Sequence, residues 1–96
     1  MKFVQIVEFK TSKIEEMAAR GRQYEQDAGG RGGKGIICAD RDNPGTYLVI
    51  ATFDSYEEAM KNSEDPLTQA LAADMAALSD GPASYRNLDV VDELSD

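Results

Sequence analysis

The side chains that most often carry out catalysis are scarce in this sequence. It contains no histidine and a single cysteine, Cys38, in 96 residues. Without histidine, acid–base chemistry near neutral pH would need an Asp, Glu, Lys, Tyr or Cys with a shifted pKa. No motif marks Cys38 as a nucleophile, and a free cysteine of this kind is most often a small buried hydrophobe. The sequence therefore identifies no catalytic residue, and it leaves open whether the protein is an enzyme.

A glycine-rich segment over residues 29–35 has the sequence GGRGGKG, and its last six residues match G-x-G-x-x-G. That pattern binds dinucleotide phosphates when it follows a strand and opens a helix. Here the order is reversed, because a predicted helix precedes the segment and a predicted strand follows it. The P-loop pattern also fails, since Gly35 follows Lys34 where Ser or Thr is needed. We expect a flexible connection in which the glycines end the helix; the alternative is a mobile lid that carries Arg31 or Lys34.

Tyrosines and one arginine are the clearest candidates for ligand contacts. Each tyrosine combines an apolar ring with a polar hydroxyl, so core packing is the default for all four: Tyr24, Tyr47, Tyr56 and Tyr85. Tyr47 lies on a predicted strand and could point into a pocket, while Arg86 begins the last strand and could pair with a carboxylate or a ligand. Carboxylates are numerous, but no spacing typical of metal ligands stands out, and we expect no metal site.

The overall charge limits the partners. A net charge of −8 disfavours nucleic acid and anionic membranes, which carry the same sign. One cysteine excludes an intrachain disulfide and suits a reducing cytoplasm. Gln5 and Glu8 interrupt the apolar N-terminal run, so we expect neither a signal peptide nor a membrane span. The sequence predicts a cytoplasmic protein with one domain over residues 1–96.

Periodicity and turn residues predict strands over 3–9, 35–40, 46–53 and 84–91, with a helix after the first strand and another after the third. Residues 12–15 and 55–58 both fit a capping box, and Gly29-Gly30 and Gly81-Pro82 should end the two helices. The second helix is expected to break at residues 62–64 and to restart at Asp65-Pro66, with Asp as cap and Pro in the first turn. The acidic residues 92–96 are expected to fray.

The order β-α-β-β-α-β is that of a ferredoxin-like α+β domain, with a four-stranded antiparallel sheet and both helices on one face. Right-handed crossovers are expected to place the first and third strands in the centre, parallel to each other. The second helix, broken near Asn62–Pro66, should contribute core or pocket wall through an apolar stripe. The stripe consists of Leu67, Leu71, Met75 and Leu78.

The third predicted strand is apolar on both faces, which is unusual for an antiparallel sheet with one wet face. Its alternating sets are Tyr47, Val49, Ala51 and Phe53, and Thr46, Leu48, Ile50 and Thr52. Two helices can cover only one face, so the other must meet a ligand, another domain or a second copy. A face-to-face homodimer is the simplest solution. The alternative is that the strand is apolar only because it is central.

The segment over residues 53–67, FDSYEEAMKNSEDPL, resembles the dimeric α/β-barrel superfamily, which includes the antibiotic-biosynthesis monooxygenases. In these proteins a strand that ends in an aromatic residue is often followed by a capped helix, a short break and a longer helix. The resemblance covers nearly the whole chain and is closest to small bacterial members without an assigned activity. It implies a homodimer with a pocket between the sheet and the helices of each subunit.

Members of this superfamily include cofactor-free oxygenases of aromatic polyketides, haem-degrading enzymes, and decarboxylases or isomerases of small aromatic and lactone substrates. Many carry a histidine in the second-helix segment; aligned on Pro66, that position is Asn62 here, and a second common histidine position is Leu67. The usual haem ligand is therefore missing, and we expect no cofactor. The resemblance makes Asn62 the first candidate for a ligand contact, beside Tyr47, Arg86, Tyr24 and Tyr56.

The function expected from these observations is a homodimer that binds a small apolar or aromatic molecule between sheet and helices. One alternative is a cofactor-independent, monooxygenase-like enzyme on an aromatic, polyketide-type substrate that Tyr47, Asn62 and Arg86 orient. Another is a non-catalytic assembly module without a pocket. A ligand-sized cavity bounded by Asn62 and Tyr47 would separate the first two functions from the third.

Overall fold

A computed structural model describes residues 1–30 and 33–94, so Arg31 of the alternative lid and the last two residues of the predicted tail lie outside the described residues. The sheet has the order β2-β3-β1-β4 and consists of β1 (Phe3–Lys10), β2 (Lys34–Ala39), β3 (Thr46–Phe53) and β4 (Ser84–Asp89). The helix α1 (Ile14–Ala28) joins β1 to β2, while α2 (Tyr56–Glu64) and α3 (Pro66–Leu78) join β3 to β4. The predicted ferredoxin-like arrangement with a broken second helix is confirmed.

The two central strands, β1 and β3, run antiparallel, with Phe3 opposite Phe53 and Lys10 opposite Thr46. The expectation that they would be parallel is wrong. The crossover through α1 returns the chain so that β2 runs in the direction of β1, and the hairpin after β2 then reverses β3. A tight turn over residues 43–46 joins the two strands of that hairpin: Gly45 has a φ of 89°, and the Thr46 N–H donates to the Asn43 carbonyl at 3.0 Å.

Thr11, not Ser12, organises the first turn of α1. Thr11 is only 4% exposed; its Oγ1 accepts from the Lys13 N–H at 2.9 Å and donates to the Leu78 carbonyl at 2.7 Å. Lys13 occupies the cap position and makes no side-chain cap bond to the described residues, so the predicted capping box at Ser12 is wrong. The bond from Thr11 ties the start of α1 to the end of α3, a contact that a local sequence pattern does not contain.

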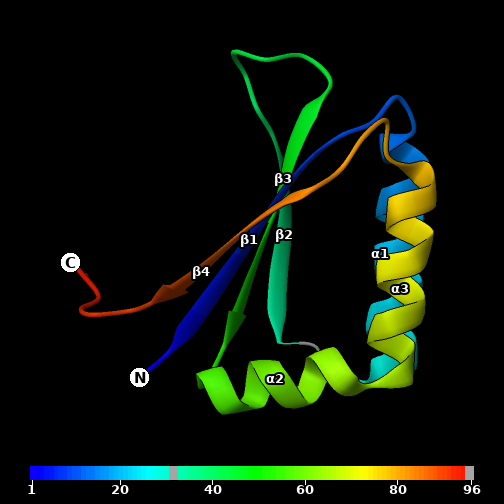
Figure 1. Cartoon of the computed structure of the whole chain (residues 1–96). Helices are drawn as coiled ribbons and strands as arrows, with labels where there is room; N and C mark the ends of the chain where they lie inside the picture. Colours follow the sequence, from blue (N-terminus) through cyan, green and yellow to red (C-terminus); the bar gives the residue numbers. More distant parts are fainter. Residues whose placement is uncertain (31–32, 95–96) are drawn as a thin grey trace.

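Asp65 alone separates α2 from α3, and the chain turns sharply there (Figure 1). Its φ of −65° and ψ of 128° reflect the proline that follows, because proline disfavours the helical region for the preceding residue. The Asp65 carboxylate caps α3 by accepting from the Leu67 N–H at 2.9 Å, and Ser55 caps α2 by accepting from the Glu58 N–H at 3.1 Å. Both helix starts were predicted, but the break is narrower than expected, and Asn62 lies in the last turn of α2.

The helices α1 and α3 lie side by side on one side of the sheet (Figure 1). An ion pair between Arg20 Nε and Asp74 Oδ2 at 2.6 Å joins them. Leu71 and Met75 of the apolar stripe of α3 face the sheet. Every residue of α3 is nevertheless at least partly exposed, because the helix does not pack closely against the strands. None of the helices in the described part of the chain is long and apolar enough to cross a membrane.

The other side of the sheet, which we call the outer face, is uncovered by any helix of the described residues. Because successive side chains of a strand point to opposite faces of the sheet, the outer face carries the residues that alternate with those facing the helices. Its apolar members are Val4, Ile6, Ile36, Leu48, Ile50 and Leu88. The edge residues Ile36 and Leu88 are 60% and 39% exposed. The sheet is therefore apolar on both sides, as the sequence indicates.

Candidate functional site

A cavity of about 650 Å³ lies between the sheet and the helices. Small-molecule sites typically have volumes of about 300–1,000 Å³. The sheet contributes residues of alternating positions to its wall: Gln5, Val7 and Phe9 of β1, and Val49, Ala51 and Phe53 of β3. The helices contribute Met17, Ala18, Gly21 and Tyr24 of α1, Asn62 of α2, and Thr68, Leu71, Ala72, Met75 and Ala76 of α3.

Small residues keep this cavity open where the helices face the sheet. Ala18 and Gly21 of α1 and Ala72 and Ala76 of α3 all line the cavity. A Cβ added at Gly21 would meet nothing within 4 Å. Glycine inside a helix costs about 0.5–1 kcal/mol relative to alanine. The chain thus keeps glycine at a position where alanine would fit and would stabilise the helix.

Three polar side chains, one from each helix, meet at the cavity wall; we call Tyr24, Asn62 and Thr68 the helix triad. The Tyr24 hydroxyl donates to Asn62 Oδ1 at 2.9 Å, and the Thr68 hydroxyl donates to the same oxygen at 3.1 Å. The two hydroxyl oxygens are 2.7 Å apart. Tyr24 is 9% exposed, while Asn62 and Thr68 are half-buried. The triad joins the three helices at one point of the cavity.

The two hydroxyl groups of the helix triad cannot supply a proton to each of the three short contacts within it. Each hydroxyl supplies one proton, yet three contacts join the hydroxyls to each other and to Asn62. In this orientation Asn62 Nδ2 has no partner among the described residues. If the amide is turned over, Nδ2 donates to the hydroxyls and Oδ1 is left without a partner. In either orientation one polar atom of Asn62, a residue that lines the cavity, has no partner among the described residues.

Of the residues predicted to contact a ligand, the structure brings Tyr24 and Asn62 together. Tyr47 lies on the helix-facing side of β3, where its ring is stacked 6.1 Å from that of Phe9, but it is not among the described residues that line the cavity. The cavity is thus bounded by Asn62 and not by Tyr47, and a ligand contact of either residue stays a prediction. The apolar stripe of the second helix contributes Leu71 and Met75 to the wall, as predicted.

The remaining two candidates lie away from the cavity. Tyr56 is 49% exposed at the start of α2 and packs its ring edge against Phe3. Arg86 is exposed on the outer face, where it is the cross-strand partner of Ile6. The neighbouring residue Tyr85 points the other way and lines the cavity. Any role of Arg86 thus belongs to the outer face.

Thr68 is the member of the helix triad that the sequence analysis missed. It precedes Leu71 by three positions and Met75 by seven, so all three lie on one face of α3. A hydroxyl on an otherwise apolar stripe was the available signal. Its significance depends on Tyr24, which lies 44 residues away in the chain.

The glycine-rich segment connects a helix to a strand, as predicted. Gly29 has a φ of 59°, and its N–H donates to the Glu25 carbonyl, which ends α1. Gly33 has a φ of 75°, and an added Cβ would lie 2.5 Å from the Thr52 carbonyl oxygen. Gly33 also lines the cavity. Two glycines of the segment therefore have defined backbone roles, and neither of these roles involves a phosphate.

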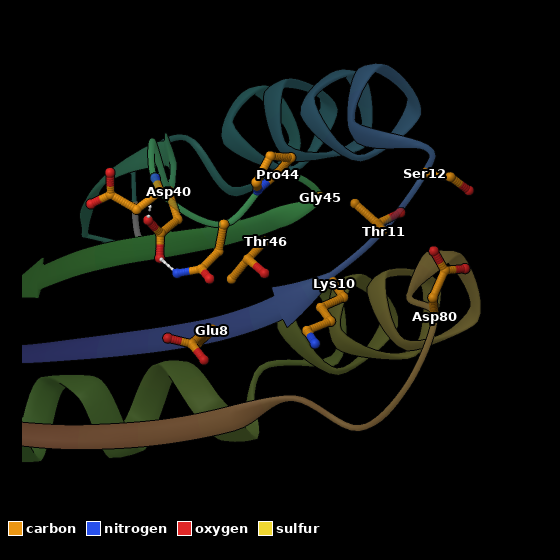
Figure 2. A pocket seen from close by; sticks show the side chains of 11 residues that line it. Glu8, Lys10, Thr11, Ser12, Asp40, Pro44, Gly45, Thr46 and Asp80 are labelled. Atoms are coloured by element: carbon orange, nitrogen blue, oxygen red, sulfur yellow. Dashed lines mark hydrogen bonds between the residues drawn. The ribbon is translucent and has the colours of Figure 1, made fainter.

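A second depression, more open and more polar, lies where β1 ends beside the β2–β3 hairpin (Figure 2). Asp40 accepts there from the side chain of Asn43 and from the Asp42 N–H, each at 3.0 Å. These bonds hold the pKa of Asp40 below its ordinary value, and the bond from the Asn43 side chain has the largest effect. They stabilise the turn itself. No group of three His, Cys, Asp or Glu side chains within residues 1–30 and 33–94 could hold a metal ion.

Comparison with solved structures identifies the fold. SnoaB, a cofactor-independent oxygenase from Streptomyces nogalater, matches with a TM-score of 0.80 and 14% identity over 99% of this chain and 98% of its own. A Caulobacter crescentus protein provisionally named an antibiotic biosynthesis monooxygenase matches with a TM-score of 0.80 and 17% identity over 95% and 91%. Rv0793 from Mycobacterium tuberculosis matches with a TM-score of 0.79 and 15% identity over 99% of this chain and 100% of its own.

No protein-family model matches the sequence, and no curated protein matches it either. At the low identities to the solved structures the likeness establishes the fold. It confirms the fold implied by the resemblance of residues 53–67.

Proposed function

We propose that this chain, which has the antibiotic biosynthesis monooxygenase-like fold, forms a homodimer and binds a small apolar or aromatic molecule between sheet and helices. The observation that carries the proposal is the cavity of about 650 Å³ with a mostly apolar wall. Binding sites for small molecules combine such walls with a few polar groups that set orientation. Here the helix triad provides polar groups of that kind.

The division of roles within the cavity follows from its chemistry. Val7, Val49 and Ala51 present a broad apolar surface on the sheet side, and burial of apolar area contributes about 25 cal/mol per Å². The apolar body of the ligand would therefore supply most of the affinity. Asn62, with one polar atom unpaired within the described residues, would orient it.

The outer face supports the homodimer. It presents half-buried apolar side chains on the two central strands: Val4 and Ile6 on β1, Leu48 and Ile50 on β3, with Ile6 directly opposite Ile50. Full burial of one such side chain contributes about 1.5–3 kcal/mol. Two copies packed through this face would cover both patches with one symmetric contact.

Native mass spectrometry of freshly purified protein tests both parts of this proposal, because it reports the subunit stoichiometry and any retained molecule together. Gly21→Leu would place a side chain in the cavity, whereas Ala19→Leu adds the same side chain on the exposed side of α1. We expect a dimer that retains a small molecule in the wild type and in Ala19→Leu but loses it in Gly21→Leu. Titration with 2-naphthol extends the test to protein purified without ligand; equal binding by both variants would contradict the cavity as the site.

The second candidate is an enzyme that oxidises a phenol-type aromatic ring with O₂. It is favoured by the shared fold with a cofactor-independent oxygenase and by the available polar atom of Asn62. In the balanced reaction one O₂ converts a phenol to a quinone and releases one water. An oxygen electrode with a panel of aromatic phenols and quinols tests this function. Oxygen uptake that Asn62→Ala abolishes would support it, and uptake no faster than in buffer across the panel would leave only binding.

A further inference from the structure

Gln5 is a polar residue in the middle of the sheet wall that faces the helices. It lies in β1 between Phe3 and Val7 on the same side of the strand, and it lines the cavity. Phe3 is 2% exposed, and Gln5 is half-buried. An amide in a largely apolar wall loses part of its hydration, which is unfavourable unless its polar atoms are bonded. A glutamine at this central position therefore needs an explanation.

The neighbours of Gln5 leave its amide open toward the cavity. Its partner in β3 is Ala51, and the partner of Ala51 in β2 is Gly35. Neither residue has a side chain long enough to cover the amide. Two positions further along β1, the corresponding row consists of Val7, Val49, Ile37 and Tyr85. The sheet wall thus changes from large apolar side chains to small and polar ones at Gln5.

Asn87 of β4 holds the Gln5 amide in place. Gln5 Nε2 donates to Asn87 Oδ1 at 3.1 Å, and no other residue in the described part of the chain bonds to this amide. Gln5 Oε1 and one Nε2 proton are thus available. If both amides are turned over, Asn87 Nδ2 donates to Gln5 Oε1 instead. In both arrangements the pair leaves a donor and an acceptor side by side, which complements a hydroxyl, because a hydroxyl also donates and accepts.

We infer that Gln5 is a second polar contact of the cavity, on the sheet wall, and that it recognises a hydroxyl group of the ligand, with Asn87 as its positioning residue. The inference rests on the proposed ligand binding between sheet and helices. The helix triad lies on the helix side of the same cavity. The ligand class that satisfies both is an aromatic ring system with polar groups on two sides, such as a dihydroxylated one.

Three naphthalene probes that carry two, one or no hydroxyl groups test this inference by isothermal titration calorimetry: 2,6-dihydroxynaphthalene, 2-naphthol and 2-methylnaphthalene. We expect the wild type to bind the diol about ten-fold more tightly than 2-naphthol, since one further hydrogen bond is formed. Gln5→Leu should bind these two equally and should bind 2-methylnaphthalene at least as well as the wild type does. Gln69→Leu, at an exposed position of α3, is the matched control and should keep the wild-type preference.

The alternative is that Gln5 only braces β4 through Asn87. In that case Gln5→Leu would lower the Tm without ligand and leave the ten-fold preference intact; we expect an equal or higher Tm and a lost preference. Asn87→Leu should reduce the preference for the diol without changing the affinity for 2-methylnaphthalene. A wild type that binds diol and 2-naphthol equally would overturn the inference and leave ligand binding standing. A wild type that binds none of the three probes would overturn the proposed function, and the inference with it.

Discussion

The hydroxyl of Tyr24 has two partners on two other helices, so its removal should affect stability directly. Tyr24→Phe takes away a buried hydroxyl that contacts Asn62 at 2.9 Å and Thr68 at 2.7 Å. We expect the free energy of unfolding to fall by about 1 kcal/mol, because a hydrogen bond contributes about 0.5–1.5 kcal/mol net. Urea unfolding measures it.

Tyr56→Phe is the control for that change. The Tyr56 side chain is 49% exposed, and its hydroxyl has no partner among the described residues. We expect a change within about 0.5 kcal/mol, as for most surface substitutions. Equal effects of the two substitutions would argue against a structural role of the helix triad.

Asn43 controls the ionisation of Asp40, and Asn43→Ala should raise the pKa of Asp40 toward its ordinary value. The Asn43 side chain is the largest cause of the lowered pKa, followed by the Asp42 N–H. A carboxyl group with a lowered pKa in the folded state stabilises the fold above its ordinary pKa and loses this effect as pH falls through the lowered value. The contribution of this ionisation to stability should thus begin to fall near the ordinary pKa of about 4 and be lost as pH falls through the lowered pKa of Asp40. Carboxyl ¹³C NMR titration of both proteins measures the pKa; an unchanged value in Asn43→Ala would contradict the assignment.

At the residue scale, the sequence predicted the parts of the site that a single segment reveals. Asn62 was proposed because the resemblance, aligned on Pro66, places it at the histidine position of the superfamily, and Tyr24 because it combines an apolar ring with a hydroxyl; both line the cavity. Thr68 and Gln5 were missed because their roles depend on partners in other elements, Tyr24 for Thr68 and Asn87 for Gln5. Arg86 was placed correctly on the last strand, but strand spacing alone did not say which face the helices would cover.

At the element scale, two glycines of the loop between α1 and β2 should respond differently to substitution. Gly29→Ala places a side chain at a φ of 59° with nothing within 4 Å of the new Cβ, which costs about 1–2 kcal/mol. Gly33→Ala has a similar backbone cost at a φ of 75°, and its Cβ would also lie 2.5 Å from the Thr52 carbonyl oxygen. We expect Gly33→Ala to lose clearly more stability than Gly29→Ala in urea unfolding. Equal losses would mean that β2 can shift away from β3 without a penalty.

Local chemistry determined which helix boundaries could be predicted. Ser55 and Asp65 act as caps because each bonds an N–H two or three residues ahead, and the proline after Asp65 fixes the break. Ser12 fits the same pattern but is exposed, because Thr11 forms the buried bond to Leu78 at the far end of α3. The direction of β3 was predicted wrongly for a related reason. That direction depends on how often the chain reverses through α1 and through the β2–β3 hairpin, so it cannot be derived from any one segment.

At the scale of the whole molecule, the two sides of the sheet differ in what covers them. On one side α1 and α3 lie over the sheet (Figure 1). A cavity separates them from the strands, so the chain forgoes some of the core that a domain of this size would otherwise use. On the other side apolar residues such as Ile6 and Ile50 lack a covering helix in the described part of the chain. A dimer through the outer face would supply the missing core, which links the open cavity to self-association.

Ile50→Lys tests this link, because Ile50 lies on the central strand β3, paired with Ile6 on one side and Ile36 on the other. By symmetry the substitution places two lysines in the proposed interface, and loss of two buried isoleucines at about 1.5–3 kcal/mol each weakens association at least 100-fold. Light scattering coupled to size exclusion at micromolar concentration should give a dimer for the wild type and a monomer for Ile50→Lys. Ala73→Lys, at an exposed position of α3, adds the same charge away from the outer face and should remain dimeric. A folded monomeric wild type, or a dimer that tolerates Ile50→Lys, would show that the outer face is not the interface.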